Sequence, residues 1–328
     1  MPPRAQCLLM DTASSSAPHP YDALTPDCVL DALSSVDLWP DGRLQPLGSY
    51  ENRVYQACLD APEQGSDKVV AKFYRPGRWS EAQVLEEHAF AQELLQAEVP
   101  VVAPWVLQGR TLHQHAGFAF SVSPWRGGRM PELDDWDTLE WLGRFLARLH
   151  VVGAQGRFVY RSVLNAQSMG YEPMQWLLTH ADMPAHVRAR WQPVCEQALT
   201  QAAQVLEATP YHAIRLHGDC HPGNILWTPV DEEGRGGPHF VDLDDARMGP
   251  AIQDLWMCIS GDRMQRSQQL STLVEGYEQI RDFDRRELAL IEPLRTLRLI
   301  HYSAWLAQRQ SDPAFQRAFP WFGTEAYW

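Results

Sequence analysis

Positive charge is scarce in this chain of 328 residues. Lysine and arginine together number 28, against 41 aspartates and glutamates, which gives a formal net charge of −13 at pH 7. Such an excess of negative charge repels the phosphate backbone of nucleic acids unless basic residues gather in one place. The sequence contains no obvious basic cluster. Nucleic acid is therefore not an expected partner.

The chain also lacks a long apolar run. None of its apolar stretches approaches the roughly 20 residues that a helix needs to cross a bilayer. The N-terminus offers only Arg4 and the short patch Leu8-Leu9-Met10, whereas a secretory signal needs a basic start and a longer apolar region. These features predict a cytoplasmic protein with no membrane partner, and we expect a monomer.

Cysteine is present without the spacing of a disulfide or zinc framework. The six residues are scattered as Cys7, Cys28, Cys58, Cys195, Cys220 and Cys258. Metal sites and disulfide scaffolds place their cysteines at short, repeated intervals. The scattered pattern favours reduced thiols, as in cytosolic proteins.

One segment of the chain has polar residues at a spacing that suits phosphoryl transfer. Asp219 precedes Asn224 by five residues, and Asp242 ends the apolar run 239–241. Kinases need one carboxylate at the attacking hydroxyl and oxygen ligands that hold Mg²⁺ across the phosphates. Residues 225–227 suit a short strand whose return would bring Asp242 beside Asn224. The segment predicts a kinase centre with Asp219 at the acceptor and with Asn224 and Asp242 on the metal.

Each of these residues also has a simpler explanation. Asp219 or Asn224 alone could form a turn by bonding its own backbone, and Asp242 could simply end a strand. A motif gains weight from its predicted surroundings. Here all three residues share one strand, loop and strand, which favours a site.

Lys72 is the residue expected to hold the nucleotide. It lies in the run 69–73, which resembles the strand that carries the phosphate-binding lysine of kinases. Lysine in a strand is usually solvent-exposed. The following helix, however, carries Glu86 and Glu87, one of which could pair with Lys72. We favour Glu87, because apolar residues follow it three, four and seven positions later.

A β-rich half of the chain precedes a mainly helical half. The first half has expected strands at 45–59, 68–74, 101–106 and 118–122, and helices from Thr25 and over 80–98. Amphipathic stretches at 136–150, 191–208, 270–281 and 294–309 predict the helices of the second half. This order predicts an α+β, bilobal, protein-kinase-like fold with a small β-rich N-lobe and a larger, mainly helical C-lobe. We expect a disordered leader at 1–20, an N-lobe at 21–122, a hinge at 123–131 and a C-lobe at 132–328.

The stretch from Leu216 to Trp256 resembles the aminoglycoside phosphotransferase and choline kinase superfamily. It reads LHGDCHPGNILW at its start and FVDLDDARMGPAIQDLW at its end. Four more stretches resemble one bacterial branch of that superfamily: GSYENRVYQ, KFYRPGRWS, EPLRTLRLIHYSAWL and FPWFGTEAYW. The resemblance covers residues 24–328 and implies ATP- and Mg²⁺-dependent phosphorylation, of Ser or Thr on protein, in a bacterial stress response.

The resemblance also implies roles for single residues. Asp219 would be the proton acceptor, Asn224 and Asp242 the Mg²⁺ ligands, and Ser49 a nucleotide contact in a loop that has one glycine in place of several. Asp254 suits a helix N-cap by its position, and the resemblance implies that it braces the catalytic loop. His217, two residues before the base, would pack and bond the backbone.

Three alternatives stay open. The acidic residues Glu132, Asp134, Asp135 and Asp137 could attract a cationic small molecule, which would make the protein a kinase of the aminoglycoside, choline or homoserine type. A metal-dependent hydrolase could use His217, Asp219, His221, Asp242, Asp244 and Asp245. The chain could also bind nucleotide without catalysis.

Two expectations concern regulation. The interval between Asp242 and Asp254 has no Ser, Thr or Tyr, so we expect no phosphorylation switch there. Cys220 follows the predicted base directly. Although an unactivated cysteine behaves mainly as a small apolar residue, oxidation of Cys220 could block turnover.

Overall fold

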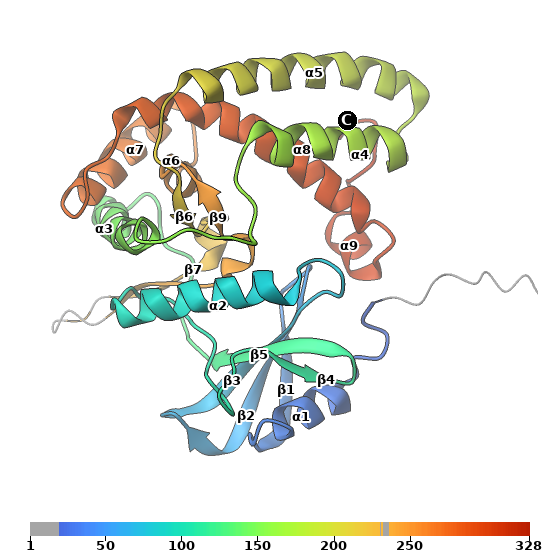
Figure 1. Ribbon diagram of the computed structural model, residues 1–328, viewed down its shortest axis with the longest axis vertical. Coiled ribbons are helices and arrows are strands. Elements are labelled where there is room, and N and C mark those ends of the chain that lie inside the picture. Colours follow the sequence, from blue (N-terminus) through green and yellow to red (C-terminus); the bar gives the residue numbers. More distant parts are fainter. Residues whose placement is uncertain (1–19, 230, 232–235) are drawn as a thin grey trace, which may run out of the picture.

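The computed structural model describes residues 20–229, 231 and 236–328, and nearly all of the predicted leader lies outside them. The described chain forms two lobes (Figure 1), a β-rich lobe followed by a larger helical one. The fold predicted from the sequence is therefore confirmed. The residue limits of the lobes and of the hinge at 123–131 stay predictions.

The N-lobe is built on one antiparallel sheet with the strand order β1-β2-β3-β5-β4. Its strands are β1 (Pro40–Leu47), β2 (Arg53–Glu63), β3 (Ser66–Phe73), β4 (His113–His115) and β5 (Phe118–Pro124). Helix α1 (Pro26–Ser34) packs on the sheet through a core that includes Val29 and Leu33. Helix α2 (Glu81–Gln96) lies between the sheet and the C-lobe in Figure 1.

The alternation of β3 explains where Lys72 points. Val69, Ala71 and Phe73 are fully buried in the core that the sheet shares with α1. Successive side chains of a strand point to opposite faces, so Lys72 faces away from that core. It pairs with Val54 of β2 and Ser121 of β5 in the register of the sheet. The lysine thus lies in the middle of the sheet, on the face away from α1.

The C-lobe combines helices with two short two-stranded sheets. Its helices are α3 (Trp136–Gly153), α4 (Glu172–His180), α5 (Ala185–Ala208), α6 (Ile252–Trp256), α7 (Arg263–Glu278), α8 (Ile291–Gln308) and α9 (Pro313–Ala318). Strand β6 (Ile214–Leu216) pairs with β9 (Arg247–Gly249), and β7 (Ile225–Thr228) pairs with β8 (Gly237–Phe240). Among the described residues, none of the helices combines the length and apolar character that crossing a membrane requires.

Helices α3 and α7 of the C-lobe pack against each other with their backbones in contact. A Cβ added at Gly143 of α3 would lie 2.1 Å from the carbonyl oxygen of Leu273, and one at Gly276 of α7 would lie 2.1 Å from that of Glu140. The two glycines therefore let the helix backbones touch. This packing anchors α3, whose Leu139 and Leu142 are fully buried.

Four details of the predicted elements were wrong. Residues 101–106 do not form a strand of the sheet. Instead, the amide of Val102 donates to the carbonyl of Phe240 in β8 at 2.9 Å. The predicted strand 45–59 is two strands separated by a loop, and α4 was not predicted at all. Asp254 lies inside α6, not at its N-cap, which is Ala251.

Candidate active site

The predicted catalytic loop, residues 217–224, lies between β6 and β7. The side-chain amide nitrogen of Asn224 donates to the carbonyl oxygen of Asp219 at 3.0 Å, which closes the loop on itself. Because the amide nitrogen is used inside the loop, the amide oxygen is the atom that Asn224 can offer to a metal. Amide and carboxylate oxygens are the ligands that hard cations select.

A buried carboxylate braces the start of this loop. Asp254 accepts the backbone N–H groups of His217 and Gly218, each at 2.9 Å, and its Oδ2 lies 3.0 Å from Nε2 of His150. Burial opposes the charge on Asp254, but the hydrogen bonds from His150 and the backbone hold the pKa of this carboxyl below its usual range. The loop is therefore fixed from beneath by an ionised group.

His217 ties the catalytic loop to the segment that carries Asp242. Its Nε2 donates to the carbonyl of Val241 at 3.0 Å, and its Nδ1 accepts the amide of Asp219 at 3.4 Å. The amide of Val241 in turn donates to the carbonyl of Asn224 at 3.0 Å. Asn224 thus lies across the strand pair from the residue before Asp242, as a shared metal site requires.

Gly218 stands where protein kinases carry arginine, and the backbone explains the difference. Its φ is +84°, and an added Cβ would lie 2.1 Å from the carbonyl oxygen of Asp245. No side chain fits in that space. The catalytic loop and the segment after Asp242 therefore approach each other backbone to backbone.

Asp242 has an unusual backbone conformation. Its φ of +61° and ψ of +63° are left-handed, a region that residues with a Cβ enter at a cost of order 1–3 kcal/mol and that recurs at functional sites. The side chain is 49% exposed, and its Oδ1 lies 2.8 Å from Nζ of Lys72. The chain thus turns sharply to present this carboxylate to the N-lobe.

Lys72 is surrounded by carboxylates. Besides Asp242, Oδ1 of Asp244 lies 3.3 Å and Oε1 of Glu87 lies 3.9 Å from its ammonium nitrogen. Burial disfavours the charge on Lys72, but these three carboxylates raise its pKa well above the usual value. Glu86 instead accepts backbone N–H groups of residues 159–161. Of the two candidate glutamates, Glu87 is therefore the one that faces Lys72.

Arg161 is a second buried cation at this point, and the sequence analysis missed it. It lies 3.6 Å from Oε2 of Glu87 and donates to the carbonyl oxygens of Ala246, at 2.6 Å, and of Asp244. Burial raises the pKa of Glu87 to about 7, against the opposing effect of Lys72 and Arg161. Arg161 thus links helix α2 to the segment that follows Asp242.

The loop 48–52 joins β1 to β2 and lies beside the strand of Lys72. Within it, the hydroxyl of Ser49 donates to the carbonyl of Asn52 at 3.1 Å. Glu51 is 8% exposed, although it lies in a loop. The reason is a set of cations and a tryptophan around its carboxylate: Arg75 at 2.9 Å, and Arg78, Arg309 and Trp305 at 2.5 Å each.

The C-terminal helices therefore hold this loop from outside. Trp305 and Arg309 come from the end of α8, and the ring of Tyr50 lies 5.0 Å from that of Phe319 and 6.2 Å from that of Phe315. The stretch FPWFGTEAYW, which begins at Phe319, was noticed in the sequence only as a resemblance. Its aromatic content was the available signal for a packing role.

Arg78 bridges the two lobes. Besides Glu51, it contacts Asp245 at 3.0 Å and Asp244 at 3.6 Å. It lies between β3 and α2 in the stretch KFYRPGRWS, and the sequence pattern gave Arg78 itself no role. The two aspartates after Asp242 are thus held by an N-lobe arginine.

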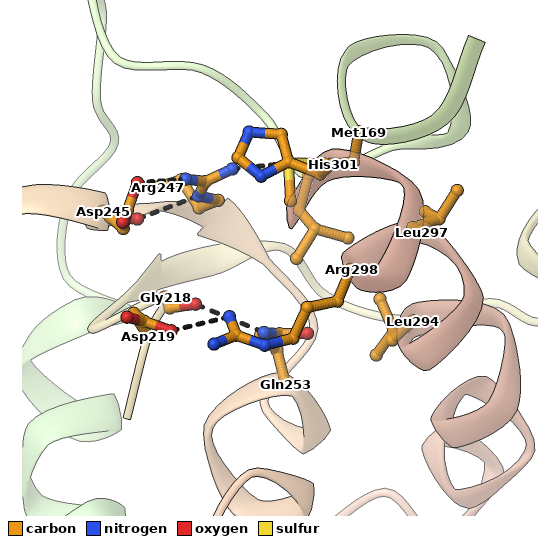
Figure 2. A pocket seen from close by; sticks show the side chains of 11 residues that line it. Met169, Gly218, Asp219, Asp245, Arg247, Gln253, Leu294, Leu297, Arg298 and His301 are labelled. Carbon is orange, nitrogen blue, oxygen red and sulfur yellow. Dashed lines mark hydrogen bonds and ion pairs between the residues drawn. The ribbon is translucent and has the colours of Figure 1, made fainter. Parts of the chain in front are cut away.

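The predicted base, Asp219, has a different set of neighbours. Its Oδ1 lies 2.6 Å from NH1 of Arg298 on α8, and its Oδ2 lies 3.6 Å from Nε2 of His221. Burial lowers the pKa of His221, so this imidazole is neutral at pH 7. Figure 2 shows Arg298 reaching from α8 to Asp219 across a small cavity of about 30 Å³, room for one or two water molecules.

Cys220 is fully buried beneath the loop. The thiol of Cys258 donates to its carbonyl at 3.1 Å, and burial raises the pKa of the Cys220 thiol well above its usual value. The thiolate is the form that reacts. This environment favours the structural role for Cys220 over the redox role.

The residues proposed for a hydrolase centre face different partners. His217 bonds the backbone of Val241, Asp244 contacts Lys72, and Asp245 accepts from Arg247 at 2.8 Å. In the part of the chain that the structure describes, no group of three or more His, Cys, Asp or Glu is placed to hold a metal ion. The geometry gives the hydrolase alternative no support.

Comparison with known proteins agrees with this geometry. The family model of the phosphotransferase enzyme family matches residues 43–291. Stress response kinase A of Escherichia coli K12 is 44% identical over 94% of this chain and 90% of its own length, and so is the serine/threonine protein kinase RdoA of Salmonella typhimurium LT2.

Solved structures share the fold at low identity. An amicoumacin kinase, hAmiN, in complex with AMP-PNP and Ca²⁺ has a TM-score of 0.67 at 21% identity and covers 90% of this chain and 91% of its own. A microcompartment-associated aminopropanol kinase has a TM-score of 0.67 at 18% identity and covers 90% and 94%. At these identities the likeness shows the fold alone.

Proposed function

The chain belongs to the phosphotransferase enzyme family, and we propose that it transfers the γ-phosphate of ATP to a Ser or Thr hydroxyl of a protein, with Mg²⁺, in a bacterial stress response. One observation carries the proposal. Lys72 of the N-lobe lies 2.8 Å from Asp242, and hydrogen bonds join Asn224 both to Asp219, through its side-chain amide, and to Val241, the residue before Asp242, through the backbone. These are the parts that phosphoryl transfer needs.

The metal would be held by Asn224 and Asp242. The carboxylate of Asp242 and the amide oxygen of Asn224 are hard ligands, and Mg²⁺ typically takes one or two of these from protein and completes its shell with phosphate oxygens and waters. When bound, the ion would neutralise negative charge on the phosphates. The donor atoms present therefore fit this cation.

The nucleotide would be held from the N-lobe. Lys72 would contact its phosphates, as the strand lysine of kinases does. Glu87 would keep the lysine in position while Arg161 balances the charge of Glu87. The backbone amides of loop 48–52 and the hydroxyl of Ser49 would contact the phosphates, and Glu51 would keep this loop fixed against the C-terminal helices.

Asp219 would act at the acceptor. The acceptor oxygen forms a bond to the γ-phosphorus, the bond from that phosphorus to the bridging oxygen of ADP breaks, and the hydroxyl proton passes to Asp219. Asp254 and His217 would position the base through the loop backbone. General-base catalysis of this kind contributes about 10²- to 10⁴-fold.

Protein is the acceptor that the curated relatives favour, because one of them is named a serine/threonine protein kinase at 44% identity. A small-molecule kinase is the second candidate, since the solved neighbours include kinases named for amicoumacin and aminopropanol. The bacterial origin of the relatives and the use of ATP support a cytoplasmic location.

The test is transfer of label from γ-labelled ATP to a cell lysate that is afterwards separated into protein and small molecules. The proposal expects label on Ser and Thr of protein with wild type and none with Asp219→Ala. Label confined to the small-molecule fraction would support the second candidate. If the protein binds ATP but label appears in neither fraction, both the protein-kinase and the small-molecule-kinase candidates are contradicted.

A further inference from the structure

Arg298 is the cation that directly contacts the predicted base, and neither the sequence pattern nor the family roles pointed to it. It lies on α8, and NH1 of its guanidinium is 2.6 Å from Oδ1 of Asp219. Its side chain is 33% exposed and that of Asp219 is 21% exposed. Both residues line the cavity in Figure 2, and both are partly exposed to solvent.

Arg298 contacts one of the two carboxylate oxygens of Asp219. Arg298 holds Oδ1, whereas Oδ2 faces His221 at 3.6 Å, which is longer than a hydrogen bond. A hydroxyl that approaches Oδ2 lies beside the guanidinium, because the two oxygens belong to one carboxylate. Arginine has five N–H donors in a planar fork that matches carboxylate and phosphate groups.

Besides Asp219 and Asp245, no residue that lines this cavity in the described part of the chain carries a carboxylate. His301 lines the cavity and is neutral at pH 7, because burial lowers its pKa to about 4. Arg247 also lines the cavity, and it contacts Asp245 at 2.8 Å. The charges at the acceptor side of Asp219 are thus two arginines and the two aspartates that they contact.

The acidic run noticed in the sequence lies around a different pocket. Glu132, Asp135 and Asp137 line a space of about 380 Å³ together with Trp141 and Trp227, and that lining contains no residue of the catalytic loop 217–224. The carboxylates that could attract a cationic substrate are therefore not those beside the base.

We propose that Arg298 selects the acceptor by binding an anionic group next to the reacting hydroxyl. The acceptor would then be a Ser or Thr with an acidic or phosphorylated residue close to it in the chain. A guanidinium at this position repels ammonium groups, so aminoglycoside- and choline-like acceptors are disfavoured. The proposal rests on the proposed function and names the acceptor class for the same site.

The experiment maps phosphorylation sites in a heat-treated, phosphatase-treated lysate incubated with ATP and Mg²⁺, with Asp219→Ala as background. Wild type is expected to label Ser and Thr that have Asp or Glu nearby, and Arg298→Gln to lose this preference. Arg298→Glu is expected to favour sites with Lys or Arg nearby. Arg298→Lys keeps the charge and should keep much of the preference.

Synthetic peptides from the mapped sites give the size of the effect. Replacing the neighbouring acid by its amide should lower kcat/KM by roughly tenfold to a hundredfold with wild type, as for one hydrogen bond to a charged group, and have little effect with Arg298→Gln. Arg295→Gln is the matched control. Arg295 lies three residues earlier on α8 and pairs with Glu292 at 3.1 Å, so this variant should behave as wild type.

The outcomes separate the two proposals. Absence of labelled protein with wild type would overturn the proposed function, and this inference with it. Labelled protein without acidic residues near the sites would overturn the inference alone. So would an acidic preference that persists in Arg298→Gln, or a loss of rate in that variant that is equal for all peptides.

Discussion

The two carboxylates of the site are each held by one cation, but the cations come from different parts of the molecule. Asp242 is 2.8 Å from Lys72, which lies in the sheet of the N-lobe. Asp219 is 2.6 Å from Arg298, which lies on a helix of the C-lobe. The first ion pair therefore joins the two lobes, and the second lies within the C-lobe.

The difference separates the two halves of the reaction. An ion pair between the lobes, such as Lys72–Asp242, depends on the relative position of the two lobes. It would rearrange when nucleotide and metal bind. A pair within one lobe keeps the base in place whether or not the nucleotide is bound. Changes on the Lys72 side should thus affect nucleotide binding, and changes on the Arg298 side should affect the acceptor.

Replacing Lys72, the cation that joins the two lobes, should have the largest effect on turnover. Lys72→Met takes away the charge that faces the phosphates, and we expect turnover to fall by about 10²- to 10³-fold, as for loss of one preorganised donor. Steady-state transfer from labelled ATP measures it. Lys68→Met is the matched control, since Lys68 lies on the same strand with its ammonium over the ring of Trp125 at 4.9 Å. Similar losses in both variants would refute the role of Lys72.

A smaller effect is expected where the C-terminal helices hold loop 48–52. Trp305→Phe removes the N–H that Trp305 donates to Glu51 at 2.5 Å. A hydrogen bond to a charged group contributes about 1.5–3 kcal/mol, so we expect the KM for ATP to rise by roughly tenfold while transfer at saturating ATP changes less. Trp321→Phe is the control, because Trp321 is 45% exposed. An unchanged KM in Trp305→Phe would show that the loop does not depend on this contact.

The smallest predicted effect is a pH dependence of the free energy of unfolding that comes from Glu87, the partner of Lys72. Burial raises the pKa of Glu87 from 4.5 to about 7. A raised pKa means that the stability contributed by the protonated group is present below about pH 4.5 and is lost as the pH rises through about 7. Glu87→Gln keeps the shape and cannot ionise. The free energy of unfolding of wild type, minus that of the variant, should therefore fall between pH 5 and pH 8.

Denaturant titrations at several pH values measure this difference. A difference that stays constant over the range would contradict the buried, titrating glutamate. A difference that rises with pH would mean that Lys72 and Arg161 outweigh burial and hold the glutamate ionised.

The sequence was most informative where chemistry depends on local spacing. The interval between Asp219 and Asn224 predicted a loop between two strands, and the run 69–73 predicted the strand that carries Lys72. Helix periodicity also singled out Glu87 over Glu86. In each case the informative pattern lies within a few neighbouring residues of the sequence.

The contacts that could not be predicted join residues far apart in the chain. Arg298 reaches Asp219, Trp305 reaches Glu51, and Arg161 reaches Glu87, and no local pattern marks an arginine or tryptophan for such a partner. The apolar residues 101–106 predict a strand, whereas Val101 and Ala103 belong to the core that contains Phe240 of β8, and Trp105 belongs to the core of the N-lobe. Tertiary packing decided these cases.

The most direct measurement is calorimetric binding of ATP, with Mg²⁺ and with a chelator, to Asp242→Asn and Asp219→Asn. The account predicts that Asp219→Asn binds ATP as wild type does, more tightly with Mg²⁺, whereas Asp242→Asn loses the gain that Mg²⁺ provides. Retention of that gain in Asp242→Asn, or its loss in Asp219→Asn, would contradict the assignment of one carboxylate to the metal and the other to the acceptor.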